Sequence, residues 1–325
     1  MTLLPRWRTG LLAALFTLAV PAVLAQAYPA RPLKLVVPFA AGGATDAIAR
    51  FVADRISRDL GQPVVVDNRA GANGAIGSEL VARSEPDGYT LLAVTAGTHA
   101  INKSLYKDLK YDPVKDFTHI GFIATAPNVL VINKSLPVSS VNELIDYARK
   151  NPGKLSFGSA GTGSTLHLAG ELFKTMASVD IVHIPYKGGS AAQVDLLSGN
   201  IQLMFDSLST ALPHIKSGRV RALGVTGETA SAALPGVPTV SDAGLGGYSA
   251  TAWFGIVGPA NMPASVTRRL NQSINKALET EEARRQFETF GADPSPKTPE
   301  RFRDHVVAEV AKWAKVVEAS GAKPN

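Results

Sequence analysis

Two glycine-rich turns have residue types and a spacing that could bind an anion. One lies in VVPFAAGGATDAIARF and the other in LSFGSAGTGSTLHLAGELF, and each joins a short apolar run to a stretch with helical spacing. The second turn has the glycine spacing of a nucleotide phosphate loop, from Gly158 to Gly163, but Ser164 stands where such a loop needs lysine. We therefore expect a smaller anion than a nucleotide.

The chemistry of these turns favours a carboxylate or one small oxyanion. A turn that leads into a helix offers N–H groups without an internal acceptor, and the helix dipole adds roughly half a positive charge there. Nearby hydroxyl groups could add donors: Thr45, Thr95, Ser159, Thr162, Ser164 and Thr165. Because hydrogen bonds to a charged acceptor contribute about 1.5–3 kcal/mol each, several of them can hold a carboxylate without lysine or arginine. The alternative is that these residues only cap two helices.

Five further side chains are candidates to line the same site. Asp46 opens a helix, where a carboxylate suits the dipole, and Asp206 follows the apolar run IQLMF, at an expected cleft edge. Either acid could instead accept a hydrogen bond from a ligand ammonium or hydroxyl group. His167 could donate to the ligand or pack against its own turn. Phe39 could stack on the ligand or pack in the core, and Tyr186 could line the cleft.

An enzymatic reading has one candidate. The segment GGSAA approaches the nucleophile elbow of a serine hydrolase, with Ser190 as the nucleophile, but it lacks the last glycine. The histidines show no metal-binding spacing, His-Glu-x-x-His is absent, and the chain contains no cysteine. We therefore predict no catalytic residue, no metal and no cofactor.

The first 27 residues have the plan of a secretory signal peptide. Arg6 and Arg8 precede an apolar run over residues 11–20, and Ala25 and Ala27 offer small residues for cleavage. The apolar run is shorter than the roughly 20 residues of a membrane-spanning helix, which disfavours an anchor. We expect residues 1–27 to be removed, with cleavage near Ala25 or Ala27, and the mature chain to reside in the periplasm.

The composition limits the class of partner. The chain has 325 residues, a formal net charge of +6 and no cysteine, so an exported form would rely on packing rather than disulfides. Basic residues alternate with acidic ones, as in KSLYKDLKYDPVKD, without an aromatic-basic stripe. Nucleic acid is therefore not an expected partner. The length favours two domains.

Strands and helices alternate along the chain. LKLVVPFA, PVVVDNR and YTLLAVTAG are expected strands, and TDAIARFVADRISRDLG is an expected helix that ends at Gly61. This rhythm predicts an open, mostly parallel sheet. A second α/β unit follows the break at residues 126–127. Two amphipathic helices, ASVTRRLNQSINKALE and PERFRDHVVAEVAKWAKVVEAS, are expected to finish the chain.

These elements predict two α/β lobes joined by a hinge with two crossings. Residues 28–126 and 228–325 would form the first lobe, and residues 127–227 the second. The crossings are expected near residues 125–128 and 226–248. An inserted domain of this kind is hinged, and its ligand cleft lies between the lobes.

The chain resembles the substrate-binding proteins of tripartite tricarboxylate transporters, also called Bug proteins, almost from end to end. The resemblance rests on these segments: VVPFAAGGATDAIAR, VVVDNRAGANGAIGSELVARSEPDGYTLL, NVLVINKSLP, YARKNPGKLSFGSAGTGSTLHLAGELF, VHIPYKGG, DLLSGNIQLMFDS, LPHIKSGRVRALGVTG, LPGVPTVSDAG and WFGIVGPANMP. It implies a type II periplasmic binding-protein fold whose cleft closes on a small carboxylate. By this resemblance, the ligand contacts would come from Phe39, Gly42, Gly43, Ala44, Thr45, Asp46, Ser159, Thr162, Ser164, Thr165 and His167.

The predicted function is that of an extracytoplasmic receptor. It would capture a small monocarboxylate, dicarboxylate, aromatic acid or amino acid. The receptor is expected to be a monomer, and it would deliver the ligand to the large and small membrane permease subunits that the resemblance implies. Two alternatives stay open: a secreted hydrolase that uses Ser190, and a sensor subunit that presents the ligand to a signalling partner.

Overall fold

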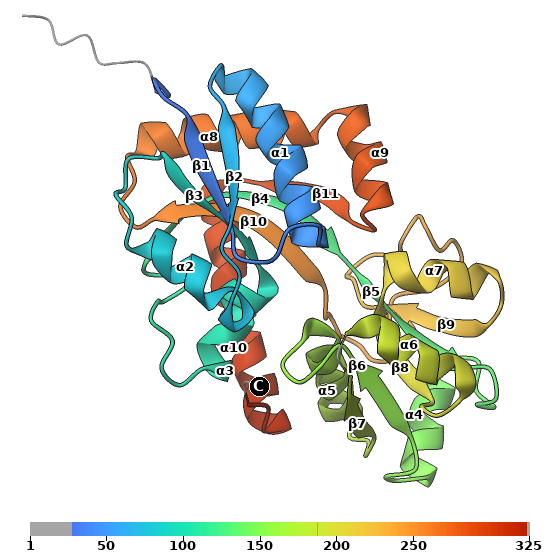
Figure 1. Cartoon of the computed structure of the whole chain (residues 1–325). Coiled ribbons are helices and arrows are strands. Elements are labelled where there is room, and N and C mark those ends of the chain that lie inside the picture. Colours follow the sequence, from blue (N-terminus) through green and yellow to red (C-terminus); the bar gives the residue numbers. More distant parts are fainter. Residues whose placement is uncertain (1–27, 187, 324–325) are drawn as a thin grey trace, which may run out of the picture.

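The computed structural model describes residues 28–186 and 188–323 and forms two lobes, each built around one sheet (Figure 1). We call the lobe with the six-stranded sheet the first lobe and the lobe with the five-stranded sheet the second lobe. The predicted signal peptide and its cleavage site lie outside the described residues. Within the described part of the chain, no helix is both long enough and apolar enough to cross a membrane.

The sheet of the first lobe has the strand order β11-β4-β10-β3-β1-β2. Its strands are β1 (Leu33–Val37), β2 (Val64–Asn68), β3 (Thr90–Thr95), β4 (Phe117–Ala126), β10 (Ala252–Pro259) and β11 (Asp293–Lys297). The α-helices of this lobe are α1 (Ala44–Leu60), α2 (Ala75–Ala82), α3 (Asn102–Leu105), α8 (Ala264–Leu278), α9 (Glu281–Thr289) and α10 (Pro299–Ser320). The lobe also has a short 3-10 helix, η1 (Ala72–Gly74), and a short π-helix, η2 (Gly97–Ile101).

The sheet of the second lobe has the strand order β7-β6-β8-β5-β9. Its strands are β5 (Asn128–Asn133), β6 (Ser156–Ser159), β7 (Val182–Pro185), β8 (Leu203–Ser207) and β9 (Val220–Val225). Its helices are α4 (Val141–Lys150), α5 (Thr165–Ala177), α6 (Gly189–Ser198) and α7 (Leu208–Lys216).

Both sheets are mixed, although β1, β2 and β3, the strands that led to the prediction of a mostly parallel sheet, do pair in parallel. In the first lobe β1 pairs in parallel with β2 and β3, but β10 runs antiparallel to β3 and β4, and β11 runs antiparallel to β4. In the second lobe β6 pairs in parallel with β7 and β8, whereas β5 runs antiparallel to β8 and β9. The reversed strands β10 and β5 directly follow the two passages between the sheets.

Helix α1 shows how the apolar pattern positions the first glycine turn. Ile48, Val52, Ile56 and Leu60 are buried, and they pack in one cluster with β1 and α8. The helix ends where Gly61 adopts a left-handed conformation (φ 68°) and its N–H binds the carbonyl of Ser57. Because this face is fixed against the sheet, the other end of α1 is held just beyond the carboxyl end of β1.

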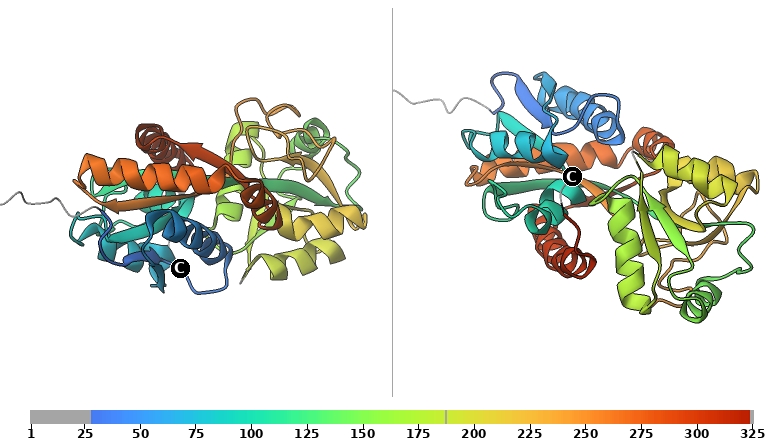
Figure 2. Two further views of the ribbon diagram at one scale, coloured as in Figure 1. Left: turned by 90° about the horizontal axis from the view of Figure 1, so that it is seen from above. Right: turned by 60° about the horizontal axis from the view of Figure 1, so that its bottom comes forward.

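The two lobes share more than the covalent crossings. The chain passes from β4 to β5 through Pro127, and it returns between Val225 and Ala252. In addition, α10 packs against β4 of the first lobe and against α5 of the second (Figure 2). Trp313 of α10 and Leu172 of α5 belong to the same buried apolar cluster. Helix α10 therefore links the two lobes by packing.

Candidate functional site

The glycine turn before α1 is exposed and leaves backbone donors free. Gly42 has a φ of +87°, and a Cβ at this position would meet no atom within 4 Å. Gly43 caps the helix without a side-chain hydrogen bond. Within the described parts of the chain, the amides of Ala44 and Thr45 and the hydroxyl of Thr45 have no hydrogen-bond partner. The turn thus offers N–H groups at the positive end of a helix of 17 residues.

Asp46 holds this turn in place. Its carboxylate accepts hydrogen bonds from the amide of Gly42, from Nε of Arg50 and from Nδ2 of Asn68, each at 2.9 Å. Burial alone would raise the pKa of Asp46, but the hydrogen bonds from Arg50, Gly42 and Asn68 outweigh it and lower the pKa to about 2. With a residue exposure of only 3%, this carboxylate faces the protein rather than the solvent. The geometry supports a structural brace more than a contact with a ligand ammonium.

The glycine turn before α5 differs from the first because its own side chains satisfy several of its donors. The Ser164 hydroxyl accepts a hydrogen bond from the His167 amide at 3.2 Å and so caps the helix. The Gly163 amide donates to Nδ1 of His167 at 3.1 Å. Over residues 28–186 and 188–323, the hydroxyls of Thr162 and Thr165 have no hydrogen-bond partner. Among the side chains of this turn, the hydroxyls of Thr162 and Thr165, rather than that of Ser164, are therefore available to a ligand.

Asp206 lies near the carboxyl end of β8 and Tyr186 directly follows β7, the two strands that flank β6, but both side chains are engaged within the protein. The buried Asp206 carboxylate accepts hydrogen bonds from the Gln193 side chain, the Ser207 amide and the Thr210 hydroxyl. Burial, which outweighs these hydrogen bonds, raises the pKa of Asp206. The Tyr186 hydroxyl donates to Asp195 at 2.6 Å.

The remaining predicted residues of the first lobe, Phe39 and Thr95, lie at the carboxyl ends of β1 and β3, which are neighbours in the sheet. Phe39 is half-buried beside Gly74, where an added Cβ would come within 3.3 Å of its ring. The Thr95 hydroxyl accepts a hydrogen bond from the Thr98 amide at 3.4 Å, so it caps a local turn. The predicted residues therefore form two groups. One group lies where β1 and β3 of the first lobe end, and the other lies where β6, β7 and β8 of the second lobe end.

The second group touches the first lobe directly. A Cβ at Gly163 would lie 2.9 Å from Cδ2 of Leu105, at the end of α3. The loop between β6 and α5 therefore faces the first lobe (Figure 1). The division at residues 126–127 and 227–228, and the assignment of both groups to one ligand site, stay predictions.

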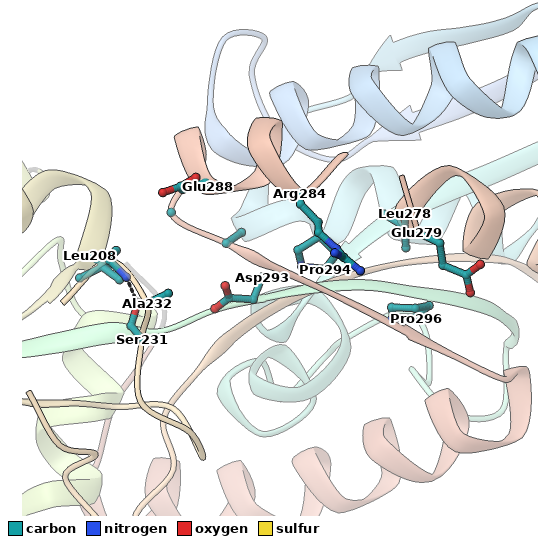
Figure 3. A pocket seen from close by; sticks show the side chains of 13 residues that line it. Leu208, Ser231, Ala232, Leu278, Glu279, Arg284, Glu288, Asp293, Pro294 and Pro296 are labelled. Atoms are coloured by element: carbon teal, nitrogen blue, oxygen red, sulfur yellow. Dashed lines mark hydrogen bonds between the residues drawn. The ribbon is translucent and has the colours of Figure 1, made fainter. Parts of the chain in front are cut away.

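A separate cavity of about 480 Å³ also spans the lobes. Figure 3 shows Leu208 and Ser231 on one side and Arg284, Asp293 and Pro294 on the other. None of the residues predicted to bind ligand lines it. Because its walls come from both lobes, its volume depends on their relative orientation.

Sequence reasoning missed three residues that shape the site. Arg50 and Asn68 hold Asp46, and Asn68 also donates to the Phe39 carbonyl at 3.0 Å. His183 contacts the Ser159 hydroxyl through Nε2 at 2.7 Å. The helical spacing of Asp46 and Arg50 could have indicated their ion pair, whereas the contacts of Asn68 and His183 depend on strand pairing between distant segments.

Ser190 has no catalytic surroundings in the described chain. It is exposed near the start of α6, and no described histidine or acid forms a hydrogen bond with its hydroxyl. The described residues also contain no group of three or more histidines and acids able to hold a metal ion.

Comparison with known proteins identifies the family. The family described as "Tripartite tricarboxylate transporter family receptor" matches residues 48–322. The chain belongs to this receptor family. Protein BugT of Bordetella pertussis is 38% identical over 315 residues, which cover 97% of this chain and 96% of BugT.

Two solved structures of similar receptors carry ligands. The structure "R. palustris Rpa4515 with adipate" is 40% identical, with a TM-score of 0.76, and the match covers 92% of this receptor and 100% of that chain. MatC (Rpa3494) from Rhodopseudomonas palustris with bound malate is 32% identical, with a TM-score of 0.72, and the match covers 89% and 100%. The predicted family and the predicted periplasmic binding-protein fold are confirmed. The chain is a periplasmic solute-binding receptor, and its family and structural neighbours are receptors rather than enzymes.

The receptor is expected to lose stability in acid through His167 and His183. Burial is the main cause that lowers the pKa of His167 to about 3, and the neighbouring His183 and Lys174 lower it further. Burial also lowers the pKa of His183 to about 4, with a further contribution from Lys174. The unfolded chain, with histidine pKa values near 6.5, therefore binds protons first as the pH falls. The stability that the two neutral histidines contribute is fully present near neutral pH, and this contribution is lost as the pH falls from about 6.5 to about 3.

Urea unfolding at pH 7, 6, 5 and 4 measures this loss. Replacing His183 by phenylalanine should reduce the slope of unfolding free energy against pH by up to about 1.4 kcal/mol per pH unit, since one proton less is taken up on unfolding. An unchanged slope would show that the pKa of His183 is not lowered in the folded receptor.

Proposed function

We propose that the receptor binds a small carboxylate between its lobes and delivers it to a tripartite tricarboxylate-type permease with a large and a small subunit. The carboxylate would be held by the free amides of Ala44 and Thr45 at the start of α1 and by the hydroxyls of Thr45, Thr162 and Thr165. The observation that carries the proposal is the uncapped, exposed N-terminus of α1, whose turn is fixed by the buried Asp46.

The related structures support this ligand class. Rpa4515 holds adipate and MatC holds malate, and both acids are small dicarboxylates. Micromolar binding needs about 8 kcal/mol. One helix end contributes up to about 2 kcal/mol, and each hydrogen bond to a charged acceptor contributes about 1.5–3 kcal/mol, so about two to four such donors reach this value before the cost of ordering is subtracted. Dicarboxylates, aromatic acids and amino acids all meet this requirement at one end of the molecule.

A thermal-shift screen tests the ligand class. We would compare adipate, malate, benzoate and glutamate with neutral sugars and divalent metal ions. A ligand at 100 times its Kd should stabilise the receptor by about 2.7 kcal/mol, which raises Tm by about 5–10 °C. A rise with sugars or metal ions alone would contradict the proposal.

A pair of glycine variants tests whether the α1 turn contacts the ligand. Gly42 and Gly61 flank the same helix, both have positive φ, and a Cβ at either would meet no atom within 4 Å. Gly42→Ala and Gly61→Ala should each destabilise the receptor by about 1–2 kcal/mol through backbone strain. Only Gly42→Ala should also weaken carboxylate binding, by about tenfold, in calorimetric titrations. Equal affinities in the two variants would remove the α1 turn from the site.

Uptake assays distinguish delivery from signalling. In cells that lack this receptor, uptake of the labelled acid found in the screen should fall and should recover when the gene is restored. Normal uptake combined with a lost transcriptional response to the acid would instead support the sensor role.

A further inference from the structure

Two imidazole rings stack against each other behind the glycine turn of the second lobe. The rings of His167, on α5, and His183, on β7, have centroids 3.8 Å apart and an angle of 25° between their planes. Phe157 of β6 stacks on His183 at 4.9 Å and 30°, since the two residues are partners in the parallel β6–β7 pair. His167 has a residue exposure of only 3%. The ring centroids of Phe157 and His167 are also only 6.3 Å apart, so the three rings form one compact cluster with His183 in contact with both others.

Each imidazole holds one end of the loop of residues 159–164. The Gly163 amide donates to Nδ1 of His167 at 3.1 Å, and the Ser159 hydroxyl pairs with Nε2 of His183 at 2.7 Å. The same hydroxyl accepts a hydrogen bond from the Gly161 amide at 3.1 Å. The loop is therefore tied at its start and near its end by side chains from two different elements.

These bonds require a neutral His167. Because Nδ1 accepts a hydrogen bond, the single ring proton of His167 must be on Nε2, which lies 3.7 Å from Oε1 of Glu171. Lys174 of α5 contacts the same carboxylate at 3.0 Å. Lys323, beyond α10, lines the same open recess, so the charged groups facing the pair are Glu171, Lys174 and Lys323. Two face-to-face rings with lysines nearby disfavour a positive charge on either ring.

We propose that the His167–His183 pair is the positioning device of the ligand loop. The two neutral rings, acting through the Gly163 amide and the Ser159 hydroxyl, hold the loop in the shape that leaves the hydroxyls of Thr162 and Thr165 free. That this loop binds the ligand rests on the function proposed above. That the two histidines position the loop does not depend on that function, because it can be measured in the ligand-free receptor. His183 is therefore a positioning residue that acts through Ser159.

Nuclear magnetic resonance of the ligand-free, 15N-labelled receptor at pH 7 tests the central bond. A nitrogen–nitrogen coupling across the hydrogen bond should correlate the Gly163 amide with Nδ1 of His167. The ring shifts should show a neutral imidazole with its proton on Nε2. A charged His167, or a His167 ring with its proton on Nδ1, would overturn the proposal.

Two substitutions of His183 separate positioning from packing. His183→Phe keeps a stacked ring but loses the bond to Ser159, whereas His183→Gln places an amide nitrogen near the position of Nε2. We expect amide hydrogen exchange at Gly161 and Gly163 to be about tenfold faster in His183→Phe and close to the original rate in His183→Gln. His214→Phe, on α7 of the same lobe, is the control and should leave both rates unchanged.

The outcomes are decisive without any ligand. Unchanged exchange at Gly161 and Gly163 in His183→Phe would overturn the proposal, and so would an equal acceleration across the amides of β8, which would indicate general loosening of the lobe. If loop exchange changes as expected but the affinity for the carboxylate found in the screen does not, then the carboxylate site is wrong and the positioning role stands.

Discussion

Replacing Glu309 by alanine is expected to lower the free energy of unfolding by about 2–6 kcal/mol, since each of two buried indole N–H groups left without an acceptor costs about 1–3 kcal/mol. The Glu309 carboxylate accepts hydrogen bonds from the indole N–H groups of Trp253 at 3.0 Å and Trp313 at 2.9 Å, and it also pairs with Lys312. Both indoles are buried, with residue exposures of 1%. The alanine variant would leave two buried donors without an acceptor.

Thermal unfolding measures this effect as a fall in Tm of about 10 °C. Glu318→Ala, at an exposed position on the same helix, is the matched control and should change stability by less than about 0.5 kcal/mol. Glu309→Gln retains one acceptor oxygen and should fall between the two. A loss no larger than that of the control would mean that solvent reaches both indoles.

Asp46→Ala should weaken carboxylate binding by about 10–100-fold, the second large effect. The carboxylate fixes the Gly42 amide and joins it to Arg50 and Asn68, so its loss frees the turn that offers the α1 amides to the ligand. A charge-assisted hydrogen bond contributes about 1.5–3 kcal/mol, and tenfold in affinity corresponds to about 1.4 kcal/mol.

Calorimetric titration with the acid that gives the largest thermal shift measures this loss. Asp54→Ala is the control, because Asp54 is exposed on the same helix and pairs only with Arg55 and Arg58 among the described residues. If Asp46→Ala and Asp54→Ala bind the acid equally well, the first glycine turn does not take part in recognition.

The sequence allowed prediction of those elements whose signals are local. The apolar spacing in α1 and its terminal glycine predicted the helix that the structure contains. The spacing of Ser140 and Glu143 is another local signal of a helix start, and at the start of α4 the Ser140 hydroxyl accepts a hydrogen bond from the Glu143 amide. Such signals act over one helical turn, so they can be read without knowledge of the fold.

Elements whose stability depends on neighbours were missed. Strand β11 contains Pro294 and Pro296, which argue against a strand, but it lies at the edge of the sheet, where missing N–H donors are tolerated. Helix α7, which contains Pro213, was not predicted, and neither was α9, which lies between the two expected C-terminal helices.

The site was predictable as a set of residues but not as a set of contacts. The composition of both turns indicated backbone donors, whereas the capping of α5 by Ser164 and the inward orientation of Asp46 follow from side-chain geometry. His183 lies 24 residues from Ser159, and only the pairing of β6 with β7 brings them together.

The packing of α10 against α5 has a practical consequence for measuring ligand capture. Residues 319–323 line the same recess as Thr162 and His167, although they are more than 140 positions away along the chain. A small environment-sensitive dye attached through a cysteine at position 323 would sit beside the loop that we expect to contact the ligand. Since the chain has no cysteine of its own, such labelling would be selective and would turn the receptor into an optical probe for its own solute.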